Sequence, residues 1–428
     1  MNTTRPADLR LAEDALLSDG SLTTVRPLTP DDLPGLDEPH RQASDRIQQV
    51  LAPGPSVAKN NAMLDVAPHA GFDLHLDTVA DNEIITSITP LLAPRSVVVI
   101  GASRGQGGAG RAVMRNLMAK NFTGRFAAVN LRAVPGEMIA GAPAYRCLAE
   151  VPWTPDLAVI AVPAAAVAGV MEECGTAGVR GVVVISSGFA EAGNADGQAE
   201  LIRIAHRHGI RLIGPNSLGA LNTDPAIRLN ATVARTTPQA TDHGGIGLAT
   251  QSGALGVSVL DTAWQRGMRI SGFVSLGNKA DVSGNDMLLY WADDPRTTVI
   301  ALHLESIGNP RRFQRIAAEV ARVKPIVALR SGRSAAAVRA GASRTAGTAT
   351  SGASTSALFR DAGVITAEST EELIDIAMLL STQPVPAGPR VVIVGNTGGA
   401  GALAADAAHD AGAVLPTLSS ETTIRLKT

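Results

Sequence analysis

Residues 97–117 read VVVIGASRGQGGAGRAVMRNL, and this stretch decides which fold the middle of the chain can adopt. A run of β-branched residues, typical of a buried parallel strand, ends at Gly101, and an amphipathic helix begins after a glycine-rich turn. The unpaired N–H groups and the positive dipole end of that helix face whatever lies in the turn. The stretch therefore predicts a phosphate-binding turn. The alternative is a tight turn that serves packing alone.

The same order of strand, turn and helix continues after this stretch. The first series has strands at 96–101, 126–130, 157–162, 181–186 and 210–213, with helices near 108–119, 164–177 and 196–208. The second series has strands at 246–251, 271–275, 298–304, 325–330 and 390–395, with helices near 253–266, 284–293, 310–323, 353–361 and 370–381. This alternation predicts an α/β protein built from doubly wound parallel sheets.

Changes in composition divide the chain into four expected segments. A polar connection at 222–244 separates the two series, and the proline-rich linker QPVPAGP at 383–389 precedes the last strand and helix. Residues near the N-terminus are rich in Asp, Pro and His and lack strong periodicity. We therefore expect an N-terminal segment, a first α/β domain, a second α/β domain and a truncated third unit, at 1–90, 91–221, 222–385 and 386–428.

The composition of the 428 residues excludes several classes of protein. A net charge of −2 with 18% charged residues leaves no electrostatic footprint for nucleic acid. No uncharged apolar run reaches the roughly 18 residues that a membrane span requires, and the N-terminus lacks the layout of a signal peptide. Cys147 and Cys174 can form neither a disulfide framework nor a zinc site, which indicates a reducing compartment. We expect a cytoplasmic globular protein without a bound metal.

Further candidate sites follow other strands. The segment IGLATQSGALGVSVLD at 246–261 places Gln251, Ser252 and Gly253 where a helix begins, although Ser252 could be an N-cap and nothing more. Gly398 and Gly399 occupy a similar turn in VGNTGGAGALAAD at 394–406.

The strand that ends at AVNLR (128–132) has no acid to bind a ribose hydroxyl. Arg132 instead favours a phosphorylated ribose, such as the 3′-phosphate of coenzyme A (CoA) or a 2′-phosphate. Ligands of open α/β sheets bind at the carboxyl edge of the strands. The turns at 101–107, 130–132 and 185–191, together with residue 163, are therefore expected to converge on one molecule.

Eight motifs that occur in order carry a resemblance to a known family. They are GASR (101–104), AVIAVPA (158–164), GVVVISSGFAE (181–191), GPNSLG (214–219), QSGALG (251–256), VSLGNKADVSGNDML (274–288), LESIGNPRRF (304–313) and SGRSAAA (331–337). Over about 91–428 the chain resembles the NDP-forming acyl-CoA synthetases, relatives of succinyl-CoA synthetase. The resemblance implies a CoA-binding Rossmann-like domain and a flavodoxin-like domain. It also implies a reaction in which acid, CoA and ATP interconvert with acyl-CoA, ADP and phosphate through a phosphorylated histidine.

The resemblance also implies roles for individual residues. The residues expected to bind CoA are Gly101, Ala102, Ser103, Arg104, Asn130, Arg132, Ser186, Ser187, Gly188 and Phe189. Gln251, Ser252 and Gly253 would face phosphate, Gly398 and Gly399 resemble a second such helix start, and Glu305 matches the carboxylate that orients the phosphohistidine. ATP, ADP and Mg would bind only to a β-type partner that carries nucleotide-grasping domains, so an oligomer is expected.

The chain departs from the family at the residue that should carry the phosphate. In SRTAGTATSGASTSALFRDAG at 343–363, Arg344 stands where the family has histidine. A guanidinium stays protonated and offers no free lone pair, so it cannot be this nucleophile. His206, His208, His243 and His303 offer no evident substitute. Phosphoryl relay is expected to be impaired.

The N-terminal segment suggests a second departure. Residues 19–46 resemble the first strand and helix of a GNAT-type acetyltransferase, and 60–76 resemble the last helix and strand of that fold. The central portion is missing, so we expect no acetyl transfer and a segment that folds only as an appendage. The alternative is an unrelated extension. Three hypotheses remain: an α-type synthetase component, a catalytically silent CoA or acyl-CoA sensor left from an acetyltransferase fusion, and a decayed gene product.

Overall fold

The computed structural model describes residues 13–16, 22–25, 81–105, 107–235, 244–332, 352–384 and 388–425. The chain divides into two units, Met1–Met378 and Leu379–Thr428. Near the N-terminus, β1 (Glu13–Leu16) pairs antiparallel with β2 (Leu22–Val25). The helices expected from the acetyltransferase resemblance at 19–46 and 60–76 lie outside the described residues.

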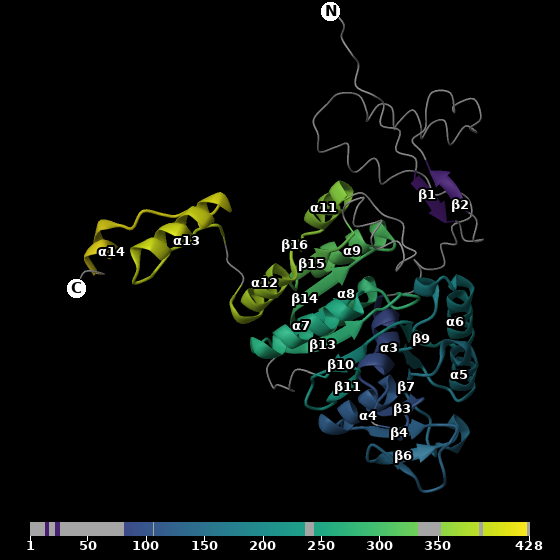
Figure 1. Cartoon of the computed structure of the whole chain (residues 1–428). Helices are drawn as coiled ribbons and strands as arrows, with labels where there is room; N and C mark the ends of the chain where they lie inside the picture. The colour runs from purple at the N-terminus through teal and green to yellow at the C-terminus, as the bar shows by residue number, and fades with distance from the viewer. Residues whose placement is uncertain are drawn as a thin grey trace, which may run out of the picture. The chain divides into compact units, whose positions relative to one another are not determined.

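The first sheet has seven strands in the order β5-β6-β4-β3-β7-β8-β9 and is parallel except for the β5–β6 pair (Figure 1). Its strands are β3 (Ser96–Ile100), β4 (Arg125–Val129), β5 (Met138–Ile139), β6 (Ala142–Tyr145), β7 (Leu157–Ile160), β8 (Gly181–Val184) and β9 (Arg211–Ile213). Because the chain passes from β3 to β4 on one side and later to β7 on the other, the strand order reverses at β3 and β7. This switch point is where open α/β sheets bind ligands.

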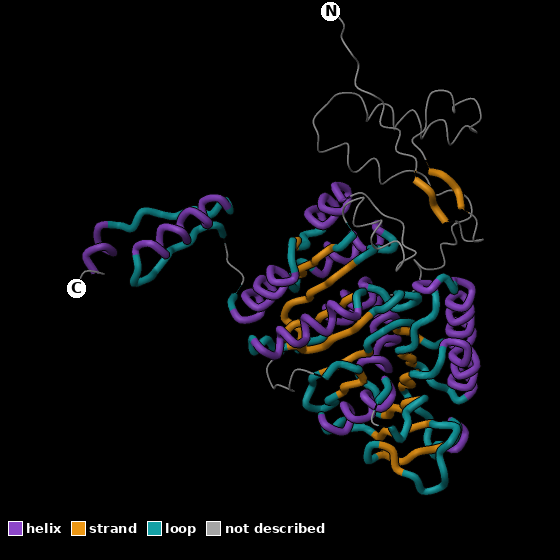
Figure 2. The backbone as a smooth tube through the Cα atoms, viewed as in Figure 1, coloured by secondary structure: helices purple, strands orange, loops and turns teal. Residues whose placement is uncertain are grey.

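Helices cover both faces of the first sheet, as Figure 2 shows. They are α3 (Asp81–Leu92), α4 (Ala109–Ala119), α5 (Ala164–Thr176) and α6 (Ala195–His208). Val97 and Val99 of β3 belong to the same buried cluster as residues of α3 and α4. Val98 and Ile100, on the opposite face, are buried with residues of α5 and α6. The two-residue period of a strand thus explains why all of β3 is apolar.

The second sheet also has seven strands, in the order β11-β10-β13-β12-β14-β15-β16. Its strands are β10 (Gly219–Asn222), β11 (Leu229–Thr232), β12 (Gly245–Thr250), β13 (Ile270–Ser275), β14 (Thr297–Leu304), β15 (Ile326–Arg330) and β16 (Ile365–Ala367). Its helices are α7 (Gly253–Gln265), α8 (Gly284–Asp293), α9 (Pro310–Val320), α11 (Gly352–Asp361) and α12 (Thr370–Thr382). Strands β12 to β16 run parallel, whereas β10 and β11 form an antiparallel pair at one edge.

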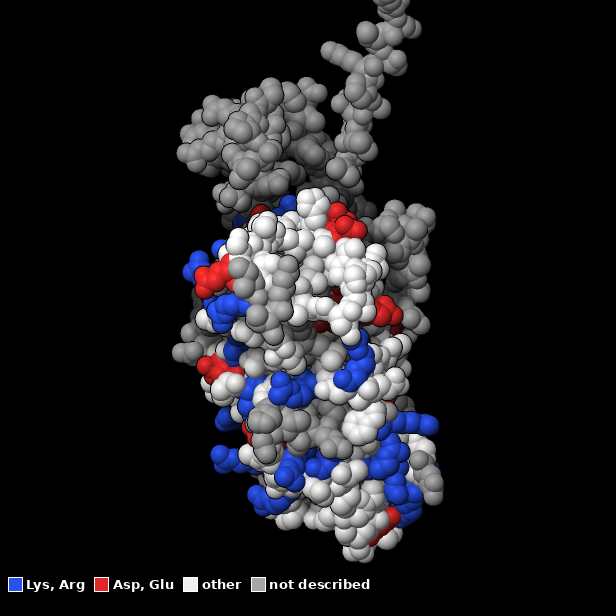
Figure 3. All heavy atoms as spheres, turned by 90° about the vertical axis from the view of Figure 1, so that its left-hand side faces the viewer, with Lys and Arg blue, Asp and Glu red and all other residues white. Residues whose placement is uncertain are grey.

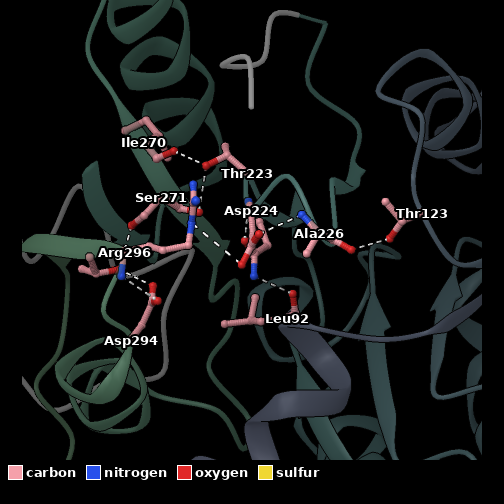
Figure 4. A network of polar contacts seen from close by, with 11 residues as sticks. Leu92, Thr123, Thr223, Asp224, Ala226, Ile270, Ser271, Asp294 and Arg296 are labelled. Atoms are coloured by element: carbon pink, nitrogen blue, oxygen red, sulfur yellow. Dashed lines mark hydrogen bonds and ion pairs between the residues drawn. The ribbon is translucent and has the colours of Figure 1, made fainter. Parts of the chain in front are cut away.

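The polar connection expected at 222–244 contains a strand. The backbone of β11 pairs with β10, and its polar side chains are satisfied, since the Thr232 hydroxyl donates to Asn230 Oδ1 at 2.7 Å. The second sheet thus begins at Gly219, slightly before the expected boundary at 222. Figure 4 shows how Asp224, in the turn between β10 and β11, lies beside Arg296, which directly precedes β14. The polar residues of β11 can be buried because they form hydrogen bonds with one another and with β10.

The helix α3 corrects the expectation that residues 1–90 form only an appendage. Ile84, Ile88, Leu91 and Leu92 recur at helical spacing, and each is at most 4% exposed in the main buried cluster. This apolar stripe packs against the first sheet and against α8. Among the described residues, the helices that cover the first sheet therefore include one that begins before the expected boundary at 91.

The expected strand at 390–395 is wrong. Within the described part of the second unit, this segment makes one isolated parallel bridge, between Arg390 and Val414. It is followed by α13 (Gly398–Asp410) and α14 (Ser420–Arg425). Val392 is 59% exposed and Val394 is 93% exposed. A β-branched run forms a stable strand only where neighbouring strands pair with it and bury it.

The helices that the structure describes include none with the length and apolar character needed to cross a membrane.

One histidine lies in the core of the second sheet. His303 of β14 is 1% exposed, and its Nε2 lies 3.1 Å from the Ser331 hydroxyl. Burial disfavours the charged imidazolium and lowers the pKa of His303 to about 4.

We expect His303 to make stability fall as the pH drops below about 6.5, the ordinary histidine pKa. Between pH 6.5 and 5 the unfolded imidazole gains a proton that the folded one does not take up, which costs about 2 kcal/mol of unfolding free energy by pH 5. His303→Gln should lose less stability than the wild type when urea unfolding is compared at pH 7 and pH 5. His206→Gln, which changes an exposed histidine of α6, serves as the control. An equal loss in His303→Gln and wild type would contradict the assignment.

Candidate functional site

A cavity of about 670 Å³ lies at the switch point of the first sheet. The residues that matter for its chemistry follow β3, β4, β6 and β7 or lie on α5: Gly101, Ser103, Arg104, Asn130, Arg132, Glu137, Arg146, Cys147, Val162, Pro163 and Glu173. Three arginines against two glutamates make the lining positive. The structure thus brings together the expected turns after 101 and 130 and the expected position 163.

Glycines allow the chain to pass closely at the base of this cavity. Gly101 has φ of 94°, and a Cβ there would lie 2.4 Å from the Ala161 carbonyl oxygen. A Cβ on Gly110 would lie 2.9 Å from the Ala102 nitrogen, so the first turn of α4 packs directly against the turn after β3. Ala102 is fully buried and can offer a ligand only its backbone. Close packing therefore accounts for both glycines, and the role of the turn in binding stays a prediction.

Arg104 lines the cavity, and its guanidinium group is hydrogen-bonded to other residues of the lining. Its Nε and Nη2 donate to the two carboxylate oxygens of Glu137, and Nη2 also donates to the Arg132 carbonyl at 3.0 Å. The Val134 N–H donates to the same carboxylate at 2.9 Å. The hydrogen bond from Arg104 is the largest cause that lowers the pKa of Glu137. Glu137 was not among the residues expected from the sequence.

Arg132 and Arg146 follow the ends of two adjacent strands, β4 and β6, and both line the cavity. Val129 pairs with Tyr145 across β4 and β6, and the Asn130 N–H donates to the Tyr145 carbonyl at 2.8 Å. Arg146 therefore follows its strand at the position where Asn130 follows the neighbouring one. Arg146 was not among the residues expected from the sequence, because the short strand β6 was not predicted there. Arg146 could have been predicted from the sequence as a basic residue that directly follows a short parallel strand.

The loop after β8 does not contribute side chains to the lining of this cavity. The Ser186 hydroxyl donates to the Val162 carbonyl at 2.5 Å, and the Gly188 N–H donates to the Glu191 carboxylate at 2.6 Å. The side chain of Phe189 is 2% exposed in the buried cluster with α5 and α6. Ser186, Ser187, Gly188 and Phe189 do not line the cavity, although the backbone turn Ser186–Gly188 lies at the same edge of the sheet.

A second polar cluster lies at the carboxyl edge of the second sheet. Gln251 Oε1 accepts from the backbone N–H groups of Glu305 at 2.6 Å and Ser306 at 2.9 Å. Ser252 is the N-cap of α7 and accepts from the Leu255 N–H, which agrees with the simpler interpretation of that serine. Gly253 begins α7. The structure thus joins Gln251 to Glu305, which lie 54 residues apart in the sequence.

Lys279 completes this cluster and was not predicted. Its ammonium donates to the Ser306 carbonyl at 2.7 Å and to the Ser306 hydroxyl at 2.8 Å. Burial lowers the pKa of Lys279 to about 8, while the nearby charge of Glu305 opposes that shift. Lys279 has a backbone φ of 55°, a conformation that residues other than glycine rarely adopt. A cation and a carboxylate thus lie together beside the start of α7.

The remaining predicted residues fall elsewhere. Gly398 and Gly399 begin α13 in the second unit, where the N-cap Thr397 makes no side-chain capping hydrogen bond. Arg344 lies outside the described residues.

Charge is distributed unevenly over the surface. Figure 3 shows Lys and Arg side chains gathered on the lower part of one face, at the height of α4, β4 and β6 in Figure 1, with few acidic side chains among them. This part of the first domain therefore presents a field that attracts anionic ligands, although the whole chain has a net charge of −2.

Comparison with known proteins agrees with the two sheets. Residues 95–223 match the family described as CoA binding domain, and residues 243–380 match the family described as Succinyl-CoA ligase like flavodoxin domain. The ADP-forming acetate–CoA ligase of Methanocaldococcus jannaschii is 40% identical over 334 residues, which cover 78% of this chain and 46% of that protein. The chain spans about half the length of such relatives.

Shorter relatives are covered more fully. The ADP-forming acetate–CoA ligase I subunit alpha of Pyrococcus furiosus is 40% identical over 331 residues, which cover 76% of this chain and 70% of that subunit. A solved structure of the dinucleotide-forming acetyl-coenzyme A synthetase 1 of Ca. Korarchaeum cryptofilum, in complex with phosphate and ADP, is similar with a TM-score of 0.73 and 38% identity. That likeness covers 78% of this chain and 70% of that one. With its CoA-binding domain and its succinyl-CoA-ligase-like flavodoxin domain, the chain belongs to the family of ADP-forming acyl-CoA synthetases.

Proposed function

We propose that the chain is the CoA-binding, α-type component of an ADP-forming acyl-CoA synthetase, in which acid, CoA and ATP give acyl-CoA, ADP and phosphate. The observation that carries the proposal is the cationic cavity at the switch point of the first sheet, lined by the turn after β3 and the ends of β4 and β6. A CoA molecule is an elongated polyanion, and a glycine turn before a helix, with arginines at its rim, suits such a ligand.

A β-type subunit would complete the enzyme. The Pyrococcus furiosus relatives are named as alpha subunits, which supports a partner that carries the nucleotide-grasping domains. ATP, ADP and Mg would bind to that partner. In this chain the cluster of Gln251, Lys279 and Glu305 would face the phosphoryl group, because a cation and helix N–H groups at one place favour an anion.

The substitution at 344 argues that the relay of phosphate is impaired. The guanidinium of Arg344 has no lone pair for attack on phosphorus. The same observation favours a second candidate function, a catalytically silent CoA or acyl-CoA sensor, and the resemblance of residues 19–46 and 60–76 to an acetyltransferase supports its origin in a fused protein. Under either function the cavity binds CoA.

CoA should protect Cys147 from alkylation. Cys147 is partly exposed and lines the cavity, whereas Cys174 is buried, and burial raises the pKa of its thiol to about 12. At pH 8, iodoacetamide should therefore modify Cys147 and spare Cys174, which acts as an internal control. Peptide mass spectrometry with and without CoA measures the protection. Equal labelling of Cys147 in both samples would place CoA elsewhere.

Arg132→Glu should weaken CoA binding in a calorimetric titration. The wild type is expected to bind in the micromolar range, and reversal of one charge in the cavity should raise Kd by about tenfold or more, since a charge-assisted hydrogen bond is replaced by repulsion. An absence of wild-type binding at millimolar CoA would overturn the proposed function.

Arg344→His should restore phosphorylation. Incubation with acetyl-CoA, labelled phosphate and a β-type subunit should yield acid-labile labelled protein in Arg344→His, and little or none in the wild type. Arg344→Gln is the matched control, because it removes the same charge without supplying a nucleophile. Labelling of the wild type that disappears in Arg344→Gln would show that relay is intact and would contradict the impairment.

A further inference from the structure

The three arginines that line the cavity differ in the hydrogen bonds that their guanidinium groups make. Arg104 donates from Nε and Nη2 to Glu137, and from Nη2 to the Arg132 carbonyl. The edge of the guanidinium that usually grips a phosphate in bidentate fashion is thus occupied by a carboxylate. Among the residues that the structure describes, the guanidinium groups of Arg132 and Arg146 make no hydrogen bond or ion pair, yet both face the same cavity.

Glu137 is a fixed partner of Arg104. Its side chain is 11% exposed, against 58% for Arg104, and the Val134 N–H donates to it at 2.9 Å. The pair connects the turn after β3 to the segment that leaves β4. Asn130 makes a parallel connection, because its amide donates to the Ala102 carbonyl at 2.6 Å. The two walls of the cavity are therefore joined twice, and Arg104 belongs to one of the joints.

Arg132 and Arg146 are two cations that line the same cavity and extend from adjacent strand ends. The hydrogen bond from the Asn130 N–H to the Tyr145 carbonyl fixes the chain ends from which they extend. A phosphomonoester carries a charge of about −1.5 to −2 near pH 7, more than one arginine neutralises. Two unpaired guanidinium groups from adjacent strand ends match such a group.

We propose that Arg132 and Arg146 bind the terminal phosphomonoester of the ligand, the 3′-phosphate if the ligand is CoA, and that Arg104 with Glu137 is a positioning pair that holds the cavity walls together. The inference rests on the proposed function in so far as CoA is the ligand. In this arrangement Arg146 contributes to selectivity for ligands that carry the phosphomonoester, and Arg104 does not contact the phosphate directly.

The test compares CoA with dephospho-CoA, which lacks the 3′-phosphate, by calorimetric titration of the full chain. Arg132→Gln and Arg146→Gln should each weaken CoA binding by about tenfold and change dephospho-CoA binding by less than about twofold. Arg132→Gln keeps the carbonyl that accepts from Arg104. Arg115→Gln is the matched control, because it removes the same charge from the exposed face of α4 and should leave both affinities unchanged.

The positioning pair gives a different pattern. Arg104→Gln and Glu137→Gln should weaken both ligands by a common factor, and the double variant should be no weaker than either single variant, since the two side chains act as one unit. Thermal unfolding of each variant checks the fold. If Arg104→Gln is unstable, Arg104→Lys keeps the charge without the bidentate pair.

Other outcomes overturn the inference. Tighter CoA binding in Glu137→Gln would make Arg104 a phosphate ligand and Glu137 its competitor. An equal effect of Arg146→Gln on both ligands, or no effect on either, would remove the proposed subsite. A wild type that binds neither ligand would instead refute the proposed function, and a wild type that binds both equally would refute only the subsite.

Discussion

A main-chain seam between the two sheets positions both polar edges of the molecule. The residues after β13 donate to the residues at the end of β9: Val282 N–H to the Leu212 carbonyl at 3.1 Å, Ala280 N–H to Gly214 at 3.1 Å, and Asn278 N–H to Pro215 at 2.9 Å. Arg211 adds ion pairs of 2.9 Å to both Asp281 and Asp286. Since each strand ends where the seam begins, the carboxyl edges of β9 and β13 meet.

The seam depends on close backbone approach, and glycine makes that approach possible. A Cβ on Gly277 would lie 2.2 Å from the Pro215 carbonyl oxygen, so a larger residue would push the two segments apart. Lys279 emerges two residues later and reaches Ser306, while the amide of its neighbour Asn278 donates to Glu191 of the first domain. One short turn thus contacts the loop after β8 and the loop that carries Glu305. The same turn therefore connects the cluster of Lys279 and Glu305 to the first domain.

The sequence predicted the turns after β3 and β12 because their information is local. A β-branched run, a glycine turn and a helix occupy some twenty adjacent residues, and the chemistry of such a turn follows from its backbone. Glu137 could not be found in this way. It reaches Arg104 only because the segment between β4 and β5 folds over the turn after β3. Phe189 shows the opposite case, since its ring, which was expected at the CoA site, is buried in the core of the first domain. The segment 390–395 has strand composition but lacks the neighbours that would make it a strand.

Under the proposed function, CoA binding and phosphoryl relay depend on different parts of the chain. The described residues that line the cavity of the first domain all lie between 100 and 173. The cluster of Gln251, Lys279 and Glu305 is held by its own hydrogen bonds at the edge of the second sheet. The hydrogen bonds that hold these two sites are made between other residues of the chain. Under the proposed function, Arg344 in place of histidine removes the reacting group, whereas the residues proposed to bind CoA belong to the first domain. Binding and relay are then separate properties of the chain, and a change in one does not require a change in the other.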